Sequence, residues 1–183
     1  MVSGALDIMW HVVSISSNAS SELVSADGWV YLRRSSRFWP SLPSRTTPRA
    51  GLAAVTLNGT TVLALGGSPR TYSTCLASVE ALDLAGALHW TPYPSMTTPR
   101  YWHAAAVLLG VIYVAGGQSC PTNDGLASVE AFDDGAWRAV ASMTTKRISF
   151  ALVALEEGAA MNGGLLVAAG GLVEGPHGVK RLA

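Results

Sequence analysis

The stretch "MTTPRYWHAAAVLLGVIYVAGG", from Met96 to Gly117, contains features that several folds share. It consists of a turn-forming segment, two short apolar runs around Gly110, and a pair of glycines. Glycines after a hydrophobic strand occur in phosphate-binding loops and also in tight structural turns. The rest of the chain distinguishes these possibilities.

The glycine pair is repeated along the chain. Pairs stand at Gly66-Gly67, Gly116-Gly117 and Gly170-Gly171, and each closes an apolar run: "TVLALGG", "VIYVAGG" and "LLVAAGG". The pairs lie 50 and 54 residues apart. A fixed period of this length is typical of a repeat architecture.

Two further signatures repeat with the glycines. The segments "SVEALD" (78–83) and "SVEAFD" (128–133) follow the first two pairs at the same distance. A tryptophan also precedes an arginine by ten residues three times, at Trp39 and Arg49, Trp90 and Arg100, and Trp137 and Arg147. Three equal spacings indicate one structural unit in several copies.

The local pattern of each unit predicts β-strands. Short runs rich in Val, Leu and aromatic residues are separated by Gly, Pro, Asn and Asp, and no window keeps a helical apolar period. In the second unit we expect strands at about 103–108, 111–116, 128–132 and 137–141. Four antiparallel strands in about fifty residues predict an all-β fold, an incomplete β-propeller of four-stranded blades.

These elements resemble the kelch-repeat family of β-propellers. The resemblance rests on the glycine pairs, "SVEAFD", the following tryptophan, and "SMTTPR" before "HAAAVL", and it covers residues 39–171. It divides the chain into kelch repeats at 39–183 and a segment 1–38 that matches poorly. Within that first segment, "DGWVYLRRSSRFW" is interpreted as the degenerate end of an upstream blade or as irregular chain.

The repeated residues are interpreted as architecture. A glycine permits positive φ and close approach of the backbone between blades, and none of the pairs extends to a phosphate-binding motif. Recurring charges are expected to brace the blades or to be solvated, and recurring methionines to pack. The residues given this structural role are Gly66, Gly67, Trp90, Arg100, Gly116, Gly117, Trp137, Arg147, Gly170 and Gly171, with Glu80, Glu130, Arg49, Met96 and Met143 beside them.

Composition excludes several functional classes. Of 183 residues 49% are hydrophobic and 13% charged, and twelve basic residues balance twelve acidic ones. A neutral chain lacks the positive field of a nucleic-acid binder. Its apolar runs are too short to span a membrane, and no signal peptide is recognised, so we expect a cytoplasmic protein. Cys75 and Cys120 show no metal spacing and are expected to remain unpaired.

No catalytic constellation is found, so we predict no catalytic residue, no metal site and no cofactor. The histidines do not lie at metal-ligand spacing; His103 is the one that faces either a ligand or a hydrogen-bonded interior. The resemblance implies a protein–protein interaction module, such as a substrate-recognition segment of a larger adaptor. The alternative it implies is a carbohydrate-active enzyme related to galactose oxidase or sialic-acid mutarotase.

Contacts with a protein or peptide partner are expected on variable loops. The loops after the glycine pairs and the turns leading into the inner strands should share one face. Aromatic, arginine and amide side chains there provide contact area and directional hydrogen bonds. The candidates are Arg70, Tyr72, Tyr101, Trp102, Gln118, Asn123 and Asp124.

The sequence contains material for about three blades, whereas propellers have typically 4 to 8. Exposed sheet edges on such a unit predict self-association. Three explanations are open: the sequence is a fragment of a larger kelch protein, which we favour; two chains form one six-bladed ring; or the chain is an unstable relic.

Overall fold

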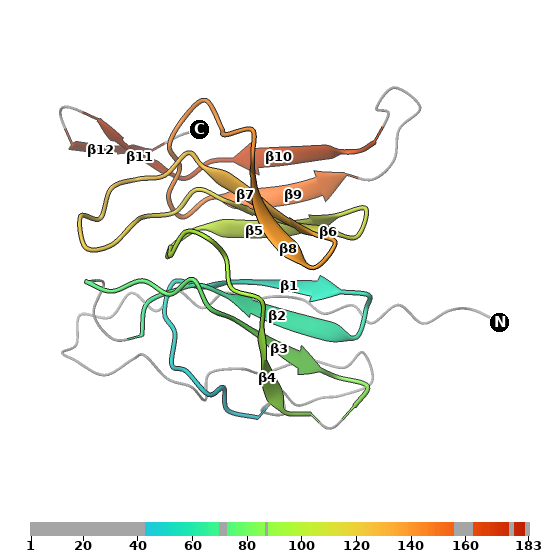
Figure 1. Ribbon diagram of the computed structural model, residues 1–183. Helices are drawn as coiled ribbons and strands as arrows, with labels where there is room; N and C mark the ends of the chain where they lie inside the picture. The colour runs from blue at the N-terminus through green and yellow to red at the C-terminus, as the bar shows by residue number, and fades with distance from the viewer. Residues whose placement is uncertain (1–42, 70–72, 87, 156–162, 176–177, 182–183) are drawn as a thin grey trace, which may run out of the picture.

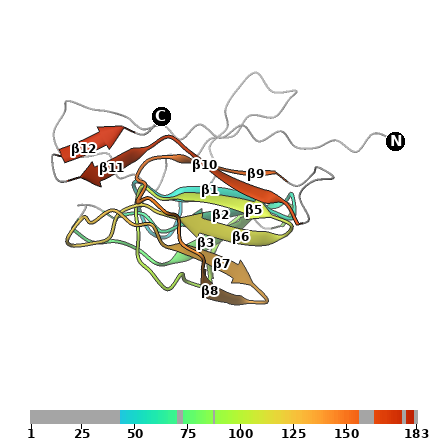
Figure 2. The same ribbon diagram turned by 90° about the horizontal axis from the view of Figure 1, so that it is seen from above.

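A computed structural model describes residues 43–69, 73–86, 88–155, 163–175 and 178–181. These residues form twelve β-strands, arranged as two four-stranded antiparallel sheets and two two-stranded sheets, and no helix. Figure 1 shows the sheets stacked one above another, as blades, and Figure 2 shows their inner strands on the same side of the stack. The predicted all-β blade architecture is therefore confirmed. The proposed domain boundary at residues 38 and 39 lies outside the described residues.

The first blade contains four strands in chain order. β1 pairs with β2, β2 with β3, and β3 with β4, each time antiparallel. The strands are β1 (Ala53–Leu57), β2 (Thr61–Leu65), β3 (Val79–Asp83) and β4 (Trp90–Tyr93).

The second blade repeats this order with β5 (Ala104–Leu108), β6 (Val111–Ala115), β7 (Val129–Asp133) and β8 (Ala136–Val140). Each boundary lies within one residue of the sequence prediction. Two of its hairpins close through two-residue turns, Leu109-Gly110 and Asp134-Gly135, in which both residues have positive φ. Such turns follow the right-handed twist of the strands, and Gly accepts this conformation without steric cost.

The third unit is shorter in the described part of the chain. β9 (Ala151–Leu155) pairs with β10 (Leu165–Ala169), whereas β11 (Leu172–Gly175) and β12 (Gly178–Arg181) form a separate hairpin. After the third glycine pair the chain thus enters a hairpin directly, without the eleven-residue segment that precedes β3 and β7.

The main hydrophobic core lies between the first two blades. Leu63 and Leu65 of the first blade and Ile112 and Val114 of the second are fully buried there, with Phe132 beside them. A second cluster, Val62, Ala64, Leu82 and Trp90, covers the opposite face of the first blade. The first blade is therefore a thin sheet stabilised by burying both of its faces.

Candidate interaction face

The glycine pairs lie where two blades meet. A Cβ atom on Gly66 would stand 2.7 Å from the carbonyl oxygen of Arg100, and one on Gly116 would stand 2.5 Å from that of Arg147. Both glycines also have positive φ, 59° and 62°. Their backbones approach the next repeat too closely to leave room for any side chain. The glycine pairs therefore have a structural role, in place of the role of a phosphate-binding loop.

A buried ion pair clamps each complete blade. Arg100 donates hydrogen bonds to the carbonyl oxygens of Gly116 and Ser128 and to Oε1 of Glu130 at 2.8 Å. Glu130 also accepts from the backbone N–H groups of Thr97 and Thr98. The connection between β4 and β5 is thereby fixed on the second blade.

Burial and hydrogen bonding oppose each other at this pair. Burial raises the pKa of Glu130, but hydrogen bonds from Thr97, Thr98 and Arg100 outweigh it, so the net pKa is lowered. Burial lowers the pKa of Arg100, and Glu130 partly offsets the change. Both groups therefore stay charged near neutral pH, and each has its hydrogen-bonding partners inside the fold.

The same clamp occurs in the first blade and in part in the third. Arg49 donates to the carbonyl oxygens of Gly66 and Ser78 and lies 3.2 Å from Glu80. Arg147 donates to the carbonyl oxygen of Gly170 at 2.6 Å. The recurring charged residues were expected either to brace the blades or to be solvated. Those that are buried brace the blades.

Tryptophan side chains join successive repeats. Nε1 of Trp90 donates to the carbonyl oxygen of Pro43, and Nε1 of Trp137 donates to that of Pro94. Each acceptor lies four residues after the tryptophan of the preceding repeat. Pro43 follows Trp39 in this way, and Pro94 follows Trp90. The repeat thus includes a specific inter-blade hydrogen bond.

The turns that lead into the inner strands form a continuous hydrogen-bonded chain. The N–H of Trp102 donates to the carbonyl oxygen of Gly51 at 2.7 Å, and the N–H of Ser149 donates to that of Trp102 at 2.9 Å. All three residues have positive φ and stand two positions after the repeat arginine. Sequence reasoning missed this feature, although the shared offset from the arginine would have located it.

Trp102 is the middle residue of this hydrogen-bonded chain. Its side chain is 37% exposed, and its ring lies above Gly51, where an added Cβ would stand 2.6 Å from the indole Cδ1. The ring of Tyr101 lies 4.9 Å from it, centroid to centroid. A large aromatic side chain is therefore presented beside the inner strands and held by a fixed backbone.

The loop after the second glycine pair packs beside this tryptophan. Tyr101 and Gln118 exchange backbone hydrogen bonds, and the Tyr101 hydroxyl donates to Oδ1 of Asn123 at 3.0 Å. Nε2 of Gln118 donates to the carbonyl oxygen of Asn123 at 2.7 Å. The N–H of Ser119 donates to the carbonyl oxygen of Asp124, which closes the loop. We call the exposed surface of Trp102, Ser149 and residues 121–124 the loop face.

A disulfide joins this loop to the corresponding loop of the first blade. Cys75 and Cys120 are bonded, with their Cα atoms 5.6 Å apart. The expectation of unpaired cysteines is wrong, because blade stacking brings the two loops together. Unpaired cysteines were one reason to expect a cytoplasmic location. The disulfide removes that reason, because disulfides persist mainly in oxidising compartments.

The structure separates the predicted contact residues into two groups. Trp102, Asn123 and Asp124 are exposed on the loop face, whereas Tyr101 and Gln118 are buried, at 2% and 7% exposure. As candidate contacts these last two were misjudged, because their side chains support the loop from within. Arg70 and Tyr72 lie outside the described residues.

His103 is an interior residue. It packs between Gly66 and Gly117 and is 6% exposed, and Leu52 and Phe150 take its place in the neighbouring repeats. Burial lowers its pKa to about 3, with a further contribution from Arg100. The backbone of Leu65 and the carboxylate of Glu130 raise the pKa and offset this lowering only in part. His103 is therefore neutral and lies in the interior.

The described residues contain no cluster of three His, Cys, Asp or Glu side chains that is suited to a metal ion. In the same part of the chain there is no apolar helix long enough to cross a bilayer. Among the described residues, the buried Arg and Glu side chains are Arg45 and those of the clamps, Arg49, Glu80, Arg100 and Glu130.

Comparison with known proteins supports the repeat architecture. Residues 99–144, which run from the lead-in turn of the second blade past its last strand, match the family described as Kelch motif. This part of the chain contains a kelch motif. The matched residues include the Arg100 clamp, the second glycine pair and Trp137, so the kelch motif coincides with the structural unit described above.

The kelch relatives are much longer than this chain. Kelch-like protein 9 of Mus musculus is 33% identical over 108 residues, which are 56% of this chain and 17% of that protein. Kelch-like protein 13 of Homo sapiens is 33% identical over 123 residues, 64% of this chain and 18% of that protein. The influenza virus NS1A-binding protein homolog of Mus musculus is 38% identical over 76 residues, 42% and 11% of the two chains. The chain thus spans less than a fifth of each.

Among solved structures, the protein YjhT has the same fold. It superimposes with a TM-score of 0.61 at 15% sequence identity, over 84% of this chain and 51% of that chain. At this identity the match concerns the fold alone. This chain therefore corresponds to about half of a larger structure of the same fold.

Proposed function

We propose that this kelch chain is a non-catalytic interaction module that holds a protein or peptide on its loop face. The observation that carries the proposal is the exposed Trp102, fixed between the hydrogen bonds of Gly51 and Ser149 and flanked by a disulfide-linked loop. Partly exposed tryptophans are frequent hot spots of protein interfaces. A rigid backbone also lowers the entropy that binding would cost.

The relatives agree with this proposal. One is named as a homolog of an influenza virus NS1A-binding protein, and the others are kelch-like proteins. Asn123 and Asp124 stand exposed beside Trp102 and add hydrogen-bond acceptors at its border. This combination suits a partner with an apolar centre and flanking N–H donors or basic groups.

The test compares two substitutions of exposed hydrophobic residues. Trp102→Ser introduces the residue that occupies the same place in the third repeat, so the backbone conformation is preserved. Leu109→Ser changes a 58% exposed residue in the β5–β6 turn, away from the loop face, and is the matched control. Each chain is immobilised and the retained proteins are quantified by mass spectrometry.

We expect that wild type and the Leu109→Ser variant retain a partner protein and that the Trp102→Ser variant does not. Retention of the same proteins by all three chains would contradict the loop face as the binding surface. A screen of monosaccharides by calorimetry addresses the carbohydrate alternative, and saturable heat that depends on Trp102 would favour that alternative.

A further inference from the structure

The turn between β1 and β2 carries a sequence motif that the loop face does not use. Asn58, Gly59 and Thr60 match the pattern Asn-x-Ser/Thr, which is the acceptor sequence for N-linked glycosylation when x is not proline. These three residues form the whole turn, because β1 ends and β2 begins at the residues on either side of them. A second match, at residues 18–20, lies outside the described residues.

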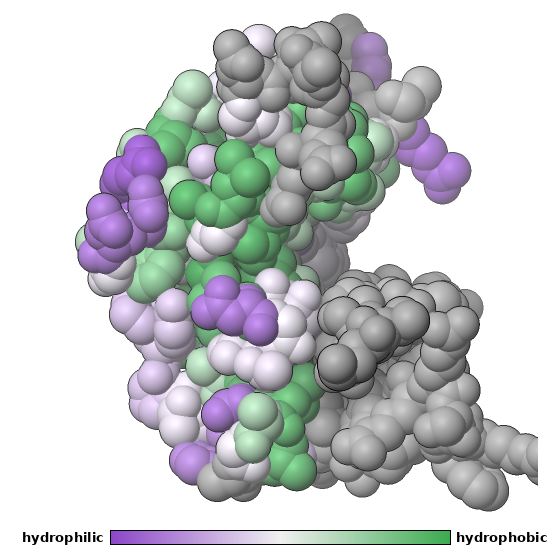
Figure 3. Space-filling model, turned by 90° about the vertical axis from the view of Figure 1, so that its right-hand side faces the viewer, coloured by the Kyte–Doolittle hydropathy of each residue, from purple (hydrophilic) through white to green (hydrophobic). Residues whose placement is uncertain are grey.

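All three residues of the turn are exposed. Asn58 and Gly59 have φ values of 53° and 72°, and a Cβ added to Gly59 would meet nothing within 4 Å. Figure 3 looks at the molecule from the end that carries this turn, and hydrophilic residues lie on the surface there. A glycan is bulky and hydrophilic, so its acceptor has to stand on an open loop of this kind.

The motif is not part of the repeat. The corresponding turn of the second blade, Leu109-Gly110, is one residue shorter and contains neither an asparagine nor a hydroxyl group. Turn chemistry accounts for Asn58 and Gly59, because both residue types accept positive φ. It does not require a hydroxyl group at Thr60, which is the residue that completes the acceptor sequence.

The disulfide favours a compartment in which this modification occurs. Cys75 and Cys120 are the two cysteines of the chain, and both are used in the bond, so no free thiol is left. Structural disulfides form and persist mainly outside the cell and in the oxidising lumen of the secretory pathway. An acceptor asparagine on an exposed turn is likewise typical of a secreted protein. A covalent bond and an acceptor sequence thus indicate the same compartment.

The acceptor turn lies at the opposite end of the first blade from the loop face. β2 begins next to the turn and ends at Leu65, immediately before the first glycine pair and the loop that contains Cys75. A strand of five residues is about 17 Å long. In Figure 1 the turn lies at the right, and the loops that follow the glycine pairs lie at the left. A glycan on Asn58 therefore leaves Trp102 accessible.

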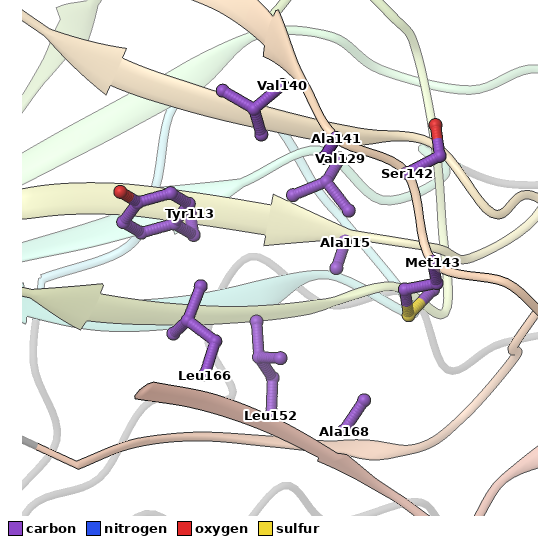
Figure 4. Close-up of a pocket in the computed structure, with 10 residues that line it drawn as sticks. All are labelled: Tyr113, Ala115, Val129, Val140, Ala141, Ser142, Met143, Leu152, Leu166 and Ala168. Atoms are coloured by element: carbon purple, nitrogen blue, oxygen red, sulfur yellow. The ribbon is translucent and has the colours of Figure 1, made fainter. Parts of the chain in front are cut away.

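An apolar cavity lies at a different place, between the second blade and β9 and β10. It measures about 360 Å³, and Tyr113 and Val140 face Leu152 and Leu166 across it (Figure 4). A second recess follows the inner strands and includes residues 54–56 of β1, but not the turn. A glycan on the turn therefore projects into solvent and fills neither recess.

We propose that Asn58 is the acceptor of an N-linked glycan and that the chain matures in the oxidising lumen of the secretory pathway. The donor is an oligosaccharide linked to a polyprenyl diphosphate. Nδ2 of Asn58 forms a bond to the anomeric carbon of the first sugar while the bond from that carbon to the diphosphate oxygen breaks. Polyprenyl diphosphate leaves, Nδ2 loses one proton to solvent, and nothing is oxidised or reduced. The Thr60 hydroxyl is the second group by which the transferase recognises the site.

The first test uses the protein purified from the cells that produce it. Trypsin releases Asn58 in the peptide 50–70 and Asn123 in the peptide 101–138, and each peptide contains a single asparagine. Asn123 is the matched control, because it is also exposed with positive φ but has a glycine two positions later. Mass spectrometry before and after treatment with peptide N-glycosidase compares the two peptides. A sample incubated without the glycosidase accounts for spontaneous deamidation.

We expect a glycan that contains N-acetylhexosamine on the peptide 50–70 alone, with conversion of Asn58 to aspartate when the glycosidase removes it. An unmodified peptide 50–70 would overturn the proposed site. Thiols are alkylated before reduction in the same sample. Alkylated Cys75 and Cys120 would overturn the oxidising compartment.

The second test defines the acceptor by substitution in the chain directed to the secretory pathway of cultured cells. An Asn18→Gln background leaves the turn as the remaining acceptor sequence. In that background Asn58→Gln and Thr60→Ala should each abolish the glycosidase-sensitive mobility shift, whereas Thr60→Ser and Asn123→Gln should retain it. The shift is measured on denatured chains, so it does not depend on the stability of a variant. No shift in the background chain, or a shift that survives Asn58→Gln, would overturn the proposal.

Discussion

At the scale of single residues, the blade junctions depend on positions where no side chain fits. Gly66 and Gly116 each approach a carbonyl oxygen of the next repeat, and the same carbonyl accepts the N–H of the second glycine in the pair. Each junction therefore combines a close backbone contact with a hydrogen bond. The buried Arg100–Glu130 ion pair then fixes the segment of the chain that crosses the junction.

Alanine substitution should separate the junction role of a glycine from its conformational role. Gly116→Ala introduces a Cβ 2.5 Å from a carbonyl oxygen, whereas Gly110→Ala meets nothing within 4 Å; both have positive φ. We expect each variant to lose about 1 kcal/mol from the strained φ. Gly116→Ala should lose a further 1 to 3 kcal/mol, on the order of an overpacked core. Urea unfolding measures both, and equal losses would contradict the junction role.

His103 should make the stability depend on pH in the mildly acidic range. Its pKa is about 3 in the folded chain, and an unfolded histidine has a pKa near 6.5, so the unfolded chain binds the proton first. Stability should therefore fall as pH drops below about 6.5, by about 2 kcal/mol between pH 6.5 and 5. The pKa values of the neighbouring Glu130 and of Glu80 are lowered, so those carboxylates lose their contribution only at lower pH.

The control for this effect is His103→Phe, which introduces the residue found at this place in the third repeat. It packs in the same space and cannot be protonated. Urea midpoints at pH 7.5 and 5.0 should differ in wild type and agree in the variant. The same pH dependence in both chains would show that His103 is not its source.

At the scale of structural elements, the loop face is assembled from loops of different blades. The strands are local hairpins, and the loops after the glycine pairs come together because the hairpins stack. The disulfide between Cys75 and Cys120 joins two such loops across 45 residues of sequence. It therefore holds the first two blades in register at the loop face.

Removal of the disulfide should destabilise the chain by up to about 4 kcal/mol, which is the loop-closure entropy expected for a loop of this size. Urea unfolding of wild type with and without reductant, and of the double variant with Cys75→Ser and Cys120→Ser, measures the change. The reduced wild type and the double variant should agree. An unchanged midpoint would show that the bond adds no constraint to the unfolded chain.

At the scale of the whole molecule, stability is unevenly distributed. The core between the first two blades contains Leu63 and Ile112 at 0% exposure, whereas β9 and β10 expose Val153 and Leu165. Elements with fewer buried contacts open more often. The third unit is thus the least protected blade of the described chain.

Hydrogen exchange should show this difference directly. In a sample diluted until the chain is monomeric, amides of β10 should exchange faster than those of β6, which occupies the same place in a complete blade. Mass spectrometry of peptides covering 111–115 and 165–169 makes the comparison. Equal protection of the two strands would contradict the uneven core.

The sequence by itself determined the repeat unit, the four strands of the second blade to within one residue, and the structural glycines, because these follow from local pattern and spacing. The tertiary structure decided which loop residues are accessible, that Tyr101 and His103 are interior, and that Cys75 meets Cys120. These outcomes depend on how blades stack, which brings together residues far apart in the chain. Local sequence does not determine which distant residues meet, so only the stacking of the blades decides these outcomes.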